Sequence, residues 1–344
     1  MRRLINTELP IIAAPMAGGP STPALVNAVT AAGGFAFLAG GYKTSEAMSA
    51  EMSAVRETGA FGVNLFVPQR DNSGALRAID PDAFAAYSSA LLAEAAALGL
   101  DLPVEPVTDD DGWQEKLEVL TADPVPVVSL TFGLPSSSDI AALKRAGTLL
   151  LATVTNPGEA REAEAAGVDG LVVQGPRAGG HSATFDPSRA LGSEPTVDVV
   201  KAVGSTTRLP LIATGGVDGS QAVAELLHAG AQSVAVGTLL LVADEAGTSA
   251  VHHAALVDPQ FTETVITTAF TGRPARALRN DFIDRLQTAA PVGYPAIHHL
   301  TRQLRQVAAK NRDPHRVHLW AGTGYRNAAP GPAASILQHL AADL

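Results

Sequence analysis

The stretch LVVQGPRAGGHSATF, residues 171–185, carries the clearest fold signal in the chain. An apolar run ends at Gln174, and a glycine-rich loop then delivers one histidine, His181. The stretches PLIATGG (210–216) and SVAVGT (233–238) repeat the pattern of a short apolar run followed by glycine. Parallel α/β barrels hold their active and phosphate sites at such strand ends. The three stretches therefore predict barrel strands that end around one site.

Outward from this stretch, short apolar runs alternate with helical segments along most of the chain. We predict eight parallel strands at residues 10–14, 35–38, 61–65, 127–130, 149–154, 170–174, 210–213 and 233–237. Eight strand–helix units close a (β/α)8 barrel, whereas an open doubly wound sheet typically has about six strands. The sequence therefore predicts an α/β fold of the TIM-barrel type.

Helix signals fall between these strands. Ser21 or Thr22 is expected as the N-cap of the first helix, with Pro23 in its first turn. A second helix is expected from Thr44 to Glu57. A long loop then leads into an alanine-rich helix at residues 81–98, which we assign to the barrel.

The pattern changes after residue 243. Residues 244–312 contain helical segments and adjacent histidine pairs but no strand-like run. We predict that they form a helical, substrate-binding subdomain that caps the barrel mouth. Residues 1–243 and 313–344 then form the barrel, to which the last loop and helix return.

Composition limits the classes of function. The 344 residues fit one barrel with a smaller addition. The net charge of −10 and the scattered Lys and Arg residues disfavour a nucleic-acid partner. The chain has no cysteine, which excludes disulfides, thiolate metal sites and thiol nucleophiles. Redox chemistry would therefore need a bound cofactor.

The start, MRRLINTELPIIAAP, lacks the apolar core and cleavage site of a secretory signal. The longest apolar stretch, around residues 234–243, is too short to span a bilayer. We therefore expect a cytoplasmic protein with no membrane segment.

Glycines after the last two strands indicate an anion site. Gly215-Gly216 and Gly237-Thr238 free backbone N–H groups to surround an anion, although each pair is also compatible with a plain turn. The chain has neither a GxxxxGKS loop nor a GxGxxG opening a helix, which disfavours P-loop and Rossmann cradles. A mononucleotide such as FMN fits this pattern better.

Other strand ends carry polar or flexible groups. Pro15-Met16 and the glycines after them would let a flat ring approach the first strand. Asn64 and Gln174 each place an amide in an apolar run, where an unmet hydrogen bond costs about 1–3 kcal/mol. Their partner is either a ligand or neighbouring backbone.

His181 follows Gly179-Gly180, where little side-chain bulk explains it as a core residue. An imidazole that titrates near neutrality can remove a proton or stabilise an anion, so His181 is the candidate catalytic residue. A metal site at the pairs His252-His253 and His298-His299 is not expected, because adjacent side chains diverge and no carboxylate is suitably spaced.

These stretches together carry a family resemblance. They include AAPMAGGPSTPALVNAVTAAGG, GVNLFVPQ, VQGPRAGGH, LIATGGVDG, VAVGT, AFTGRPARAL, YPAIHHLTRQLR and LWAGTGYR. Nearly the whole chain resembles the nitronate monooxygenase family, formerly 2-nitropropane dioxygenase, in its bacterial class I form. The resemblance implies a barrel that binds FMN without covalent linkage. It also implies oxidation of an alkyl nitronate by O2 to a carbonyl compound and nitrite, with one-electron transfers from the flavin.

The resemblance also implies roles for individual residues. His181 matches the family's catalytic histidine, and Tyr294 and Tyr325 are expected to shape the substrate pocket. Arg177 departs from the family, which often has an acidic residue there; it either adds charge near an anionic substrate or faces water. The residues expected to contact FMN are Pro15, Met16, Asn64, Gln174, Gly179, Gly180, Gly215, Gly216, Gly237 and Thr238.

Two other functions fit a barrel with these loops. One is an NAD(P)H-dependent FMN reductase of quinones or of enoyl-acyl-carrier-protein, which flavin reduction by NADPH would reveal. The other is a flavin-free isomerase or lyase acting on a phosphorylated substrate, which would be colourless. The physiological nitronate, such as propionate 3-nitronate, and the oligomeric state are not fixed by the sequence.

Overall fold

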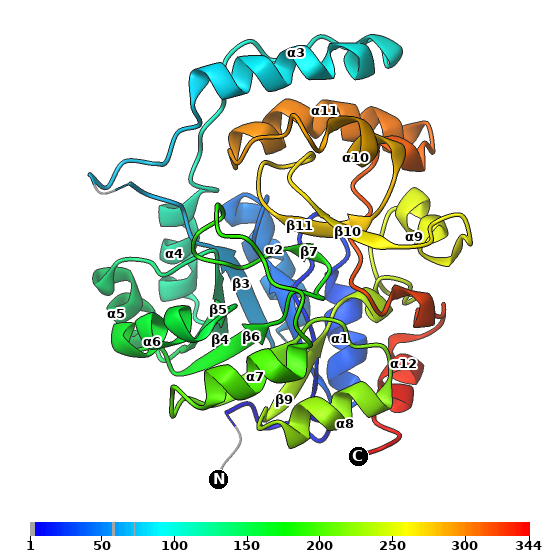
Figure 1. The fold of residues 1–344 in the computed structure, drawn as a ribbon. Helices are drawn as coiled ribbons and strands as arrows, with labels where there is room; N and C mark the ends of the chain where they lie inside the picture. The colour runs from blue at the N-terminus through cyan, green and yellow to red at the C-terminus, as the bar shows by residue number, and fades with distance from the viewer. Residues whose placement is uncertain (1–3, 57–58, 72) are drawn as a thin grey trace.

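A computed structural model describes residues 4–56, 59–71 and 73–344. Eight parallel strands close a barrel in the order β1-β2-β3-β4-β5-β6-β8-β9 (Figure 1). They are β1 (Ile11–Ala13), β2 (Phe35–Ala39), β3 (Gly62–Phe66), β4 (Val127–Thr131), β5 (Leu149–Val154), β6 (Gly170–Gln174), β8 (Leu211–Thr214) and β9 (Ser233–Val236). Each lies within one residue of its predicted ends, so the TIM-barrel prediction is confirmed.

Side chains alternate between the barrel interior and the surrounding helices, as the strand period of two requires. Ile12 and Phe37 fill the interior, whereas Ile11 and Leu38 pack outward under the helices. The interior is therefore a packed core, and a ligand must bind at an end of the barrel.

The outer helices are α1 (Pro23–Ala31), α2 (Ser45–Val55), α4 (Trp113–Ala122), α5 (Ser137–Arg145), α6 (Pro157–Ala166), α7 (Thr196–Gly204), α8 (Ser220–His228) and α12 (Ala333–Leu340). Thr22 is the N-cap of α1, since its hydroxyl accepts a hydrogen bond from the Leu25 amide at 3.0 Å. The predicted end of the second helix, Glu57, lies outside the described residues. Helix α12 packs against α1 and α8, so the last helix returns to the barrel.

The prediction that residues 244–312 contain no strand is wrong. Besides α9 (Ala250–Val257), α10 (Asp281–Leu286) and α11 (Ala296–Lys310), this segment has strands β10 (Thr264–Thr267) and β11 (Ala275–Leu278). They pair antiparallel, and β11 also pairs with β7 (Gly180–His181). Neither strand has the apolar run of a barrel strand, because threonines flank Val265-Ile266 in β10 and Arg276 interrupts β11. Their third partner comes from a distant loop.

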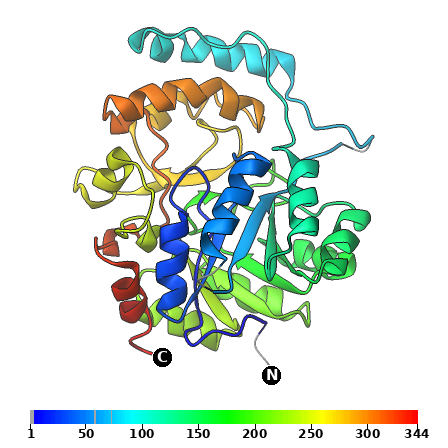
Figure 2. The same ribbon diagram turned by 180° about the vertical axis from the view of Figure 1, so that it is seen from behind.

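The assignment of the alanine-rich helix to the barrel is also wrong. Helix α3 (Pro81–Ala97) packs against α11, and its Tyr87 hydroxyl donates to the Ala269 carbonyl at 2.6 Å. Figures 1 and 2 show α3 lying over α11, away from the barrel. Helix α4 instead joins β3 to β4. An apolar helix face does not reveal which neighbour it covers, so the sequence could not place α3.

We call residues 244–312 together with α3 the cap. Its apolar core is separate from that of the barrel and includes Tyr87, Phe270 and Phe282. Among the described residues, no helix combines the length and apolar character needed to cross a bilayer.

Candidate functional site

A cavity of about 1050 Å³ lies where the C-terminal ends of the barrel strands meet the cap. Apart from two tyrosines, every predicted site residue lines it: Pro15, Met16, Asn64, Gln174, Gly179, Gly180, His181, Gly215, Gly216, Gly237 and Thr238. The barrel thus gathers residues that are far apart in the sequence at one site.

Three glycine loops form one side of this cavity. Gly215 and Gly216 have φ angles of 110° and 74°, which favour glycine. A Cβ atom on Gly216 would lie 2.7 Å from the Arg177 Cβ, so no larger residue fits. The third loop was not predicted as part of the site: the Gly322 amide donates to the Thr238 hydroxyl at 2.9 Å and lines the same cavity.

Arg177 belongs to the outside of these loops. Its carbonyl accepts a hydrogen bond from the Thr323 amide at 3.1 Å, and its side chain is exposed and does not line the cavity. Of the two roles considered for Arg177, the structure favours the one in which it faces water.

The two strand-end amides bond mainly to protein. The Asn64 side-chain nitrogen lies 2.9 Å from both the Ser129 and Thr131 hydroxyl oxygens. The Gln174 amide nitrogen donates to the His181 carbonyl at 3.1 Å, and its oxygen accepts from the Ala183 amide at 2.8 Å. Gln174 therefore fixes the backbone at the candidate catalytic residue and just after it.

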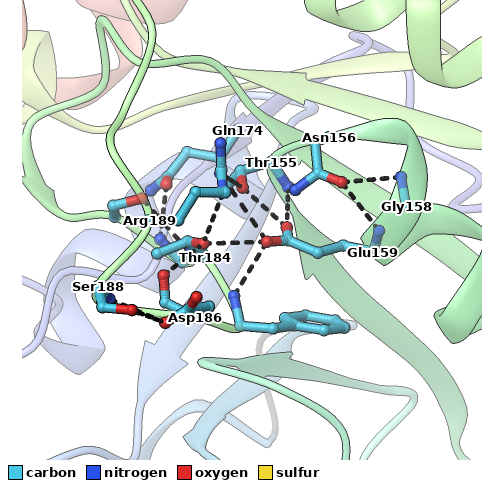
Figure 3. A network of polar contacts seen from close by, with 12 residues as sticks. Thr155, Asn156, Gly158, Glu159, Gln174, Thr184, Asp186, Ser188 and Arg189 are labelled. Carbon is cyan, nitrogen blue, oxygen red and sulfur yellow. Dashed lines mark hydrogen bonds and ion pairs between the residues drawn. The ribbon is translucent and has the colours of Figure 1, made fainter.

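The loop after His181 is anchored again by a buried carboxylate (Figure 3). Glu159, which is 5% exposed, accepts hydrogen bonds from the Thr184 hydroxyl and the Phe185 amide, both at 3.0 Å. Its second oxygen accepts from the Thr155 amide at 2.6 Å, and Arg189 donates to the Thr155 hydroxyl, also at 2.6 Å. These bonds tie the loop to the start of α6.

A third anchor comes from the cap. The guanidinium of Arg273, which is 0% exposed, donates to the carbonyls of Ser182 and Thr184 and lies 3.8 Å from the centre of the Phe132 ring. Together with the β7–β11 pairing, these bonds attach the His181 loop to the cap as well as to the barrel.

The chemistry of His181 differs from the prediction. Burial, followed by the positive charges of Arg273 and Arg305, lowers the pKa of His181 to about 3. The imidazole therefore does not titrate near neutrality and is uncharged at pH 7. Its ring contacts the protein through Nε2, which lies 2.9 Å from the Thr271 hydroxyl.

Aromatic rings surround this imidazole. The ring centres of Trp320, Phe132 and Tyr294 lie 5.4, 5.7 and 5.8 Å from that of His181. Phe132 follows β4 with a φ of 83°, a strained conformation of the kind found at functional sites. Neither Phe132 nor Trp320 was predicted, because a single aromatic residue carries no pattern in the sequence.

The two predicted pocket tyrosines occupy different places. Tyr294 lies beside His181 but lines a small neighbouring pocket with Phe66 and Pro295. Tyr325 is buried, and its hydroxyl donates to the Phe261 carbonyl at 2.7 Å. Tyr325 does not line the cavity, so its position does not support a role in the pocket.

The cap brings a buried cation to the cavity. Arg305 is 6% exposed, and its guanidinium donates to the His298 carbonyl at 2.9 Å and to the Thr301 hydroxyl at 3.1 Å. Neither Arg305 nor Arg273 forms an ion pair with a carboxylate of the described residues. Arg305 lines the cavity, whereas Arg273 lies behind it against Phe132. Arg305 is therefore the buried, unpaired cation available to an anionic ligand.

The histidine pairs serve the protein scaffold. His252 hydrogen-bonds to the Trp320 carbonyl at 2.9 Å, and His298 stacks on the Tyr42 ring with centres 4.3 Å apart. His299 lies 2.7 Å from Asp109. His252, His298 and His299 also line the cavity. Within the described ranges, no group of three or more histidine and carboxylate residues is arranged to hold a metal ion.

Comparison with known proteins adds to this geometry. The family model described as nitronate monooxygenase matches residues 1–343. A probable nitronate monooxygenase of Staphylococcus aureus (strain Newman) is 32% identical over 345 residues, covering 99% of this chain and 95% of that protein.

Solved structures give the same fold. A nitroalkane oxidase from Streptomyces ansochromogenes has 43% sequence identity and a TM-score of 0.91, covering 98% of this chain and 96% of the other. FabK from Thermotoga maritima has 23% identity and a TM-score of 0.73, with coverages of 98% and 93%. At that identity the second likeness concerns the fold alone.

Proposed function

Because the chain belongs to the nitronate monooxygenase family, we propose that it is an FMN-dependent oxidoreductase that converts alkyl nitronates and O2 into carbonyl compounds and nitrite. The observation that carries this proposal is the cavity in which glycine loops, a neutral histidine and an unpaired buried arginine meet. A nitronate is an anion, and such a site suits an anion held beside a flat cofactor.

The size and lining of the cavity support FMN as the cofactor. Ligand pockets of about 300–1000 Å³ hold drug-sized molecules, and this one is about 1050 Å³. The phosphate would lie against the loops at Gly215-Gly216 and Gly237-Thr238, where the glycines leave room for a close approach. The flat ring would lie against Pro15, Met16 and the Asn64 strand end. When bound, FMN supplies the electron-transfer chemistry that this cysteine-free chain lacks.

The chain's own residues would bind and orient the substrate. Arg305 lies in the cap, where little water screens its charge, and attracts the nitronate group. An anion there also offsets the effect of Arg273 and Arg305 on the pKa of His181 and raises it. His181 could then hold a proton next to the substrate. The rings of Phe132, Tyr294 and Trp320 exclude water around it. We assign residues 244–312 to substrate binding.

The proposal is tested by mixing the purified protein, without air, with propionate 3-nitronate and separately with NADPH. We expect a flavin absorbance spectrum that is bleached by the nitronate and not by NADPH, with nitrite formed once air is admitted. Bleaching by NADPH alone would identify an NAD(P)H-dependent reductase instead. A colourless protein that binds no added FMN would refute the proposal.

A further inference from the structure

The imidazole of His181 has one hydrogen-bond partner among the described residues. Thr271, 1% exposed in the loop before β11, places its Oγ1 atom 2.9 Å from Nε2 of the ring. The described residues supply no partner for the Nδ1 atom, and His181 lines the cavity. Nδ1 is therefore the ring nitrogen that remains available to a ligand.

The surroundings of the Thr271 hydroxyl decide which nitrogen carries the proton. Its oxygen lies 3.3 Å from the Arg273 carbonyl oxygen, which has no other donor among the described residues, and it accepts the Arg273 amide at 3.4 Å. A hydroxyl has one proton to donate and can accept two. If the proton goes to the Arg273 carbonyl, the hydroxyl accepts from both the Arg273 amide and His181 Nε2–H, and every group is satisfied.

The opposite arrangement, in which Thr271 donates its proton to His181, has the higher free energy. If Thr271 donated to His181 Nε2, the ring proton would sit on Nδ1 and the buried Arg273 carbonyl would lose its donor. An unsatisfied buried acceptor costs about 1–3 kcal/mol. The ring is neutral at pH 7, so it carries one proton and its position is set by this difference.

We propose that Thr271 is a positioning residue that holds His181 in the tautomer with its proton on Nε2, so that the imidazole exchanges protons with a bound substrate at Nδ1. The tautomer follows from the hydrogen bonds alone. The statement about the substrate rests on the proposed function.

Nuclear magnetic resonance tests the tautomer directly. Protein labelled with ¹⁵N-histidine and purified with its cofactor gives long-range ¹⁵N–¹H correlations that distinguish the two neutral tautomers, and the His181 signals are those missing from His181→Asn. We expect the Nε2–H form in the wild type and in Thr271→Ser, which keeps the hydroxyl. Thr271→Val keeps the shape without the hydroxyl and should show a substantial Nδ1–H population.

Steady-state kinetics test whether this tautomer matters for turnover. With a nitronate substrate we expect kcat to fall about tenfold or more in Thr271→Val and to be largely restored in Thr271→Ser, with KM and flavin content nearly unchanged. A wild-type protein whose His181 ring carries its proton on Nδ1 would overturn the proposal, even if Thr271→Val does not fold. An unchanged tautomer in Thr271→Val would overturn it too. An Nε2–H signal in a protein that oxidises no nitronate would refute the proposed function and leave the tautomer standing.

Discussion

The two walls of the cavity differ in chemistry. The barrel wall, formed by the loops after β1, β6, β8 and β9, presents glycines, Pro15, Met16 and the Gln174 amide. The charged barrel-side residues of the lining come from the loops after β2 and β3 instead: Lys43, Glu46, Asp109, Asp111 and Glu115. The cap wall, formed by Thr271, His298, Arg302 and Arg305, presents hydroxyl, imidazole and guanidinium groups. Backbone and small residues suit a cofactor that stays, whereas buried charge suits an anion that enters and leaves. The barrel wall should therefore control flavin binding and the cap wall turnover.

His181 stands between the two walls. It arrives on the loop after β6, but its backbone pairs with β11 and its ring contacts Thr271. From its place between the two walls, we predict that His181→Asn lowers turnover of a nitronate by about 10²- to 10⁴-fold. This is the usual range for a residue that acts in general acid–base catalysis. Flavin content, read from the absorbance of the purified protein, should stay at the wild-type level. Full turnover in the variant would remove His181 from the chemistry.

A substitution in the barrel wall should instead weaken FMN binding. In Gly216→Ala the new Cβ meets Arg177 at 2.7 Å, in a backbone conformation with a φ of 74°. The free loop would relax away from this strained conformation, and restoring it to bind the phosphate would cost about 1–3 kcal/mol. That corresponds to roughly a five- to 150-fold loss of FMN affinity, measured by titrating the cofactor-stripped protein.

Gly204→Ala is the matched control for this change. Gly204 lies in α7, away from the cavity, and an added Cβ finds only an ordinary contact of 3.4 Å with Leu211. FMN affinity should be unaffected. Equal losses in both variants would show that the glycine loops have no special part in binding flavin.

On the cap wall, Arg305→Met should raise KM for a nitronate about tenfold, because the substrate loses a charged hydrogen-bonding partner. Flavin affinity should change little. Arg302→Met is the matched control: Arg302 lies on the same helix and lines the same cavity, but it is exposed and its charge is screened by water. If Arg302→Met raised KM as much as Arg305→Met, burial would not be what makes the cap wall attract an anion.

Several of these features could be predicted from the sequence. The strands, Gly215-Gly216, Gly237-Thr238 and His181 each have a local signal, because apolar runs and glycines adjoin them. Thr271 and Arg305 lie in the quoted stretches AFTGRPARAL and YPAIHHLTRQLR, but nothing there marks them as site residues, since their importance comes from burial beside a loop far away in the chain. The pKa of His181 could not be predicted either, because it depends on burial and then on the charges of Arg273 and Arg305.

The cap should also make the fold sensitive to acid, through His252 in α9. Burial lowers the pKa of His252 to about 4, below its ordinary value near 6.5. The unfolded chain therefore binds more protons than the folded one below pH 6.5, and stability falls as the pH drops from 6.5 towards 4. His252→Gln should reduce this slope by up to about 1.4 kcal/mol per pH unit in urea unfolding. An unchanged slope in His252→Gln would contradict the assignment.

A crystal structure of the purified, cofactor-containing protein tests the central claim most directly. We predict FMN in the cavity, with its phosphate within hydrogen-bonding distance of the Gly216 and Thr238 backbone amides and its ring facing the His181 imidazole. A flavin bound with its phosphate against the cap, a different molecule in the cavity, or an imidazole turned away from the ring would contradict it.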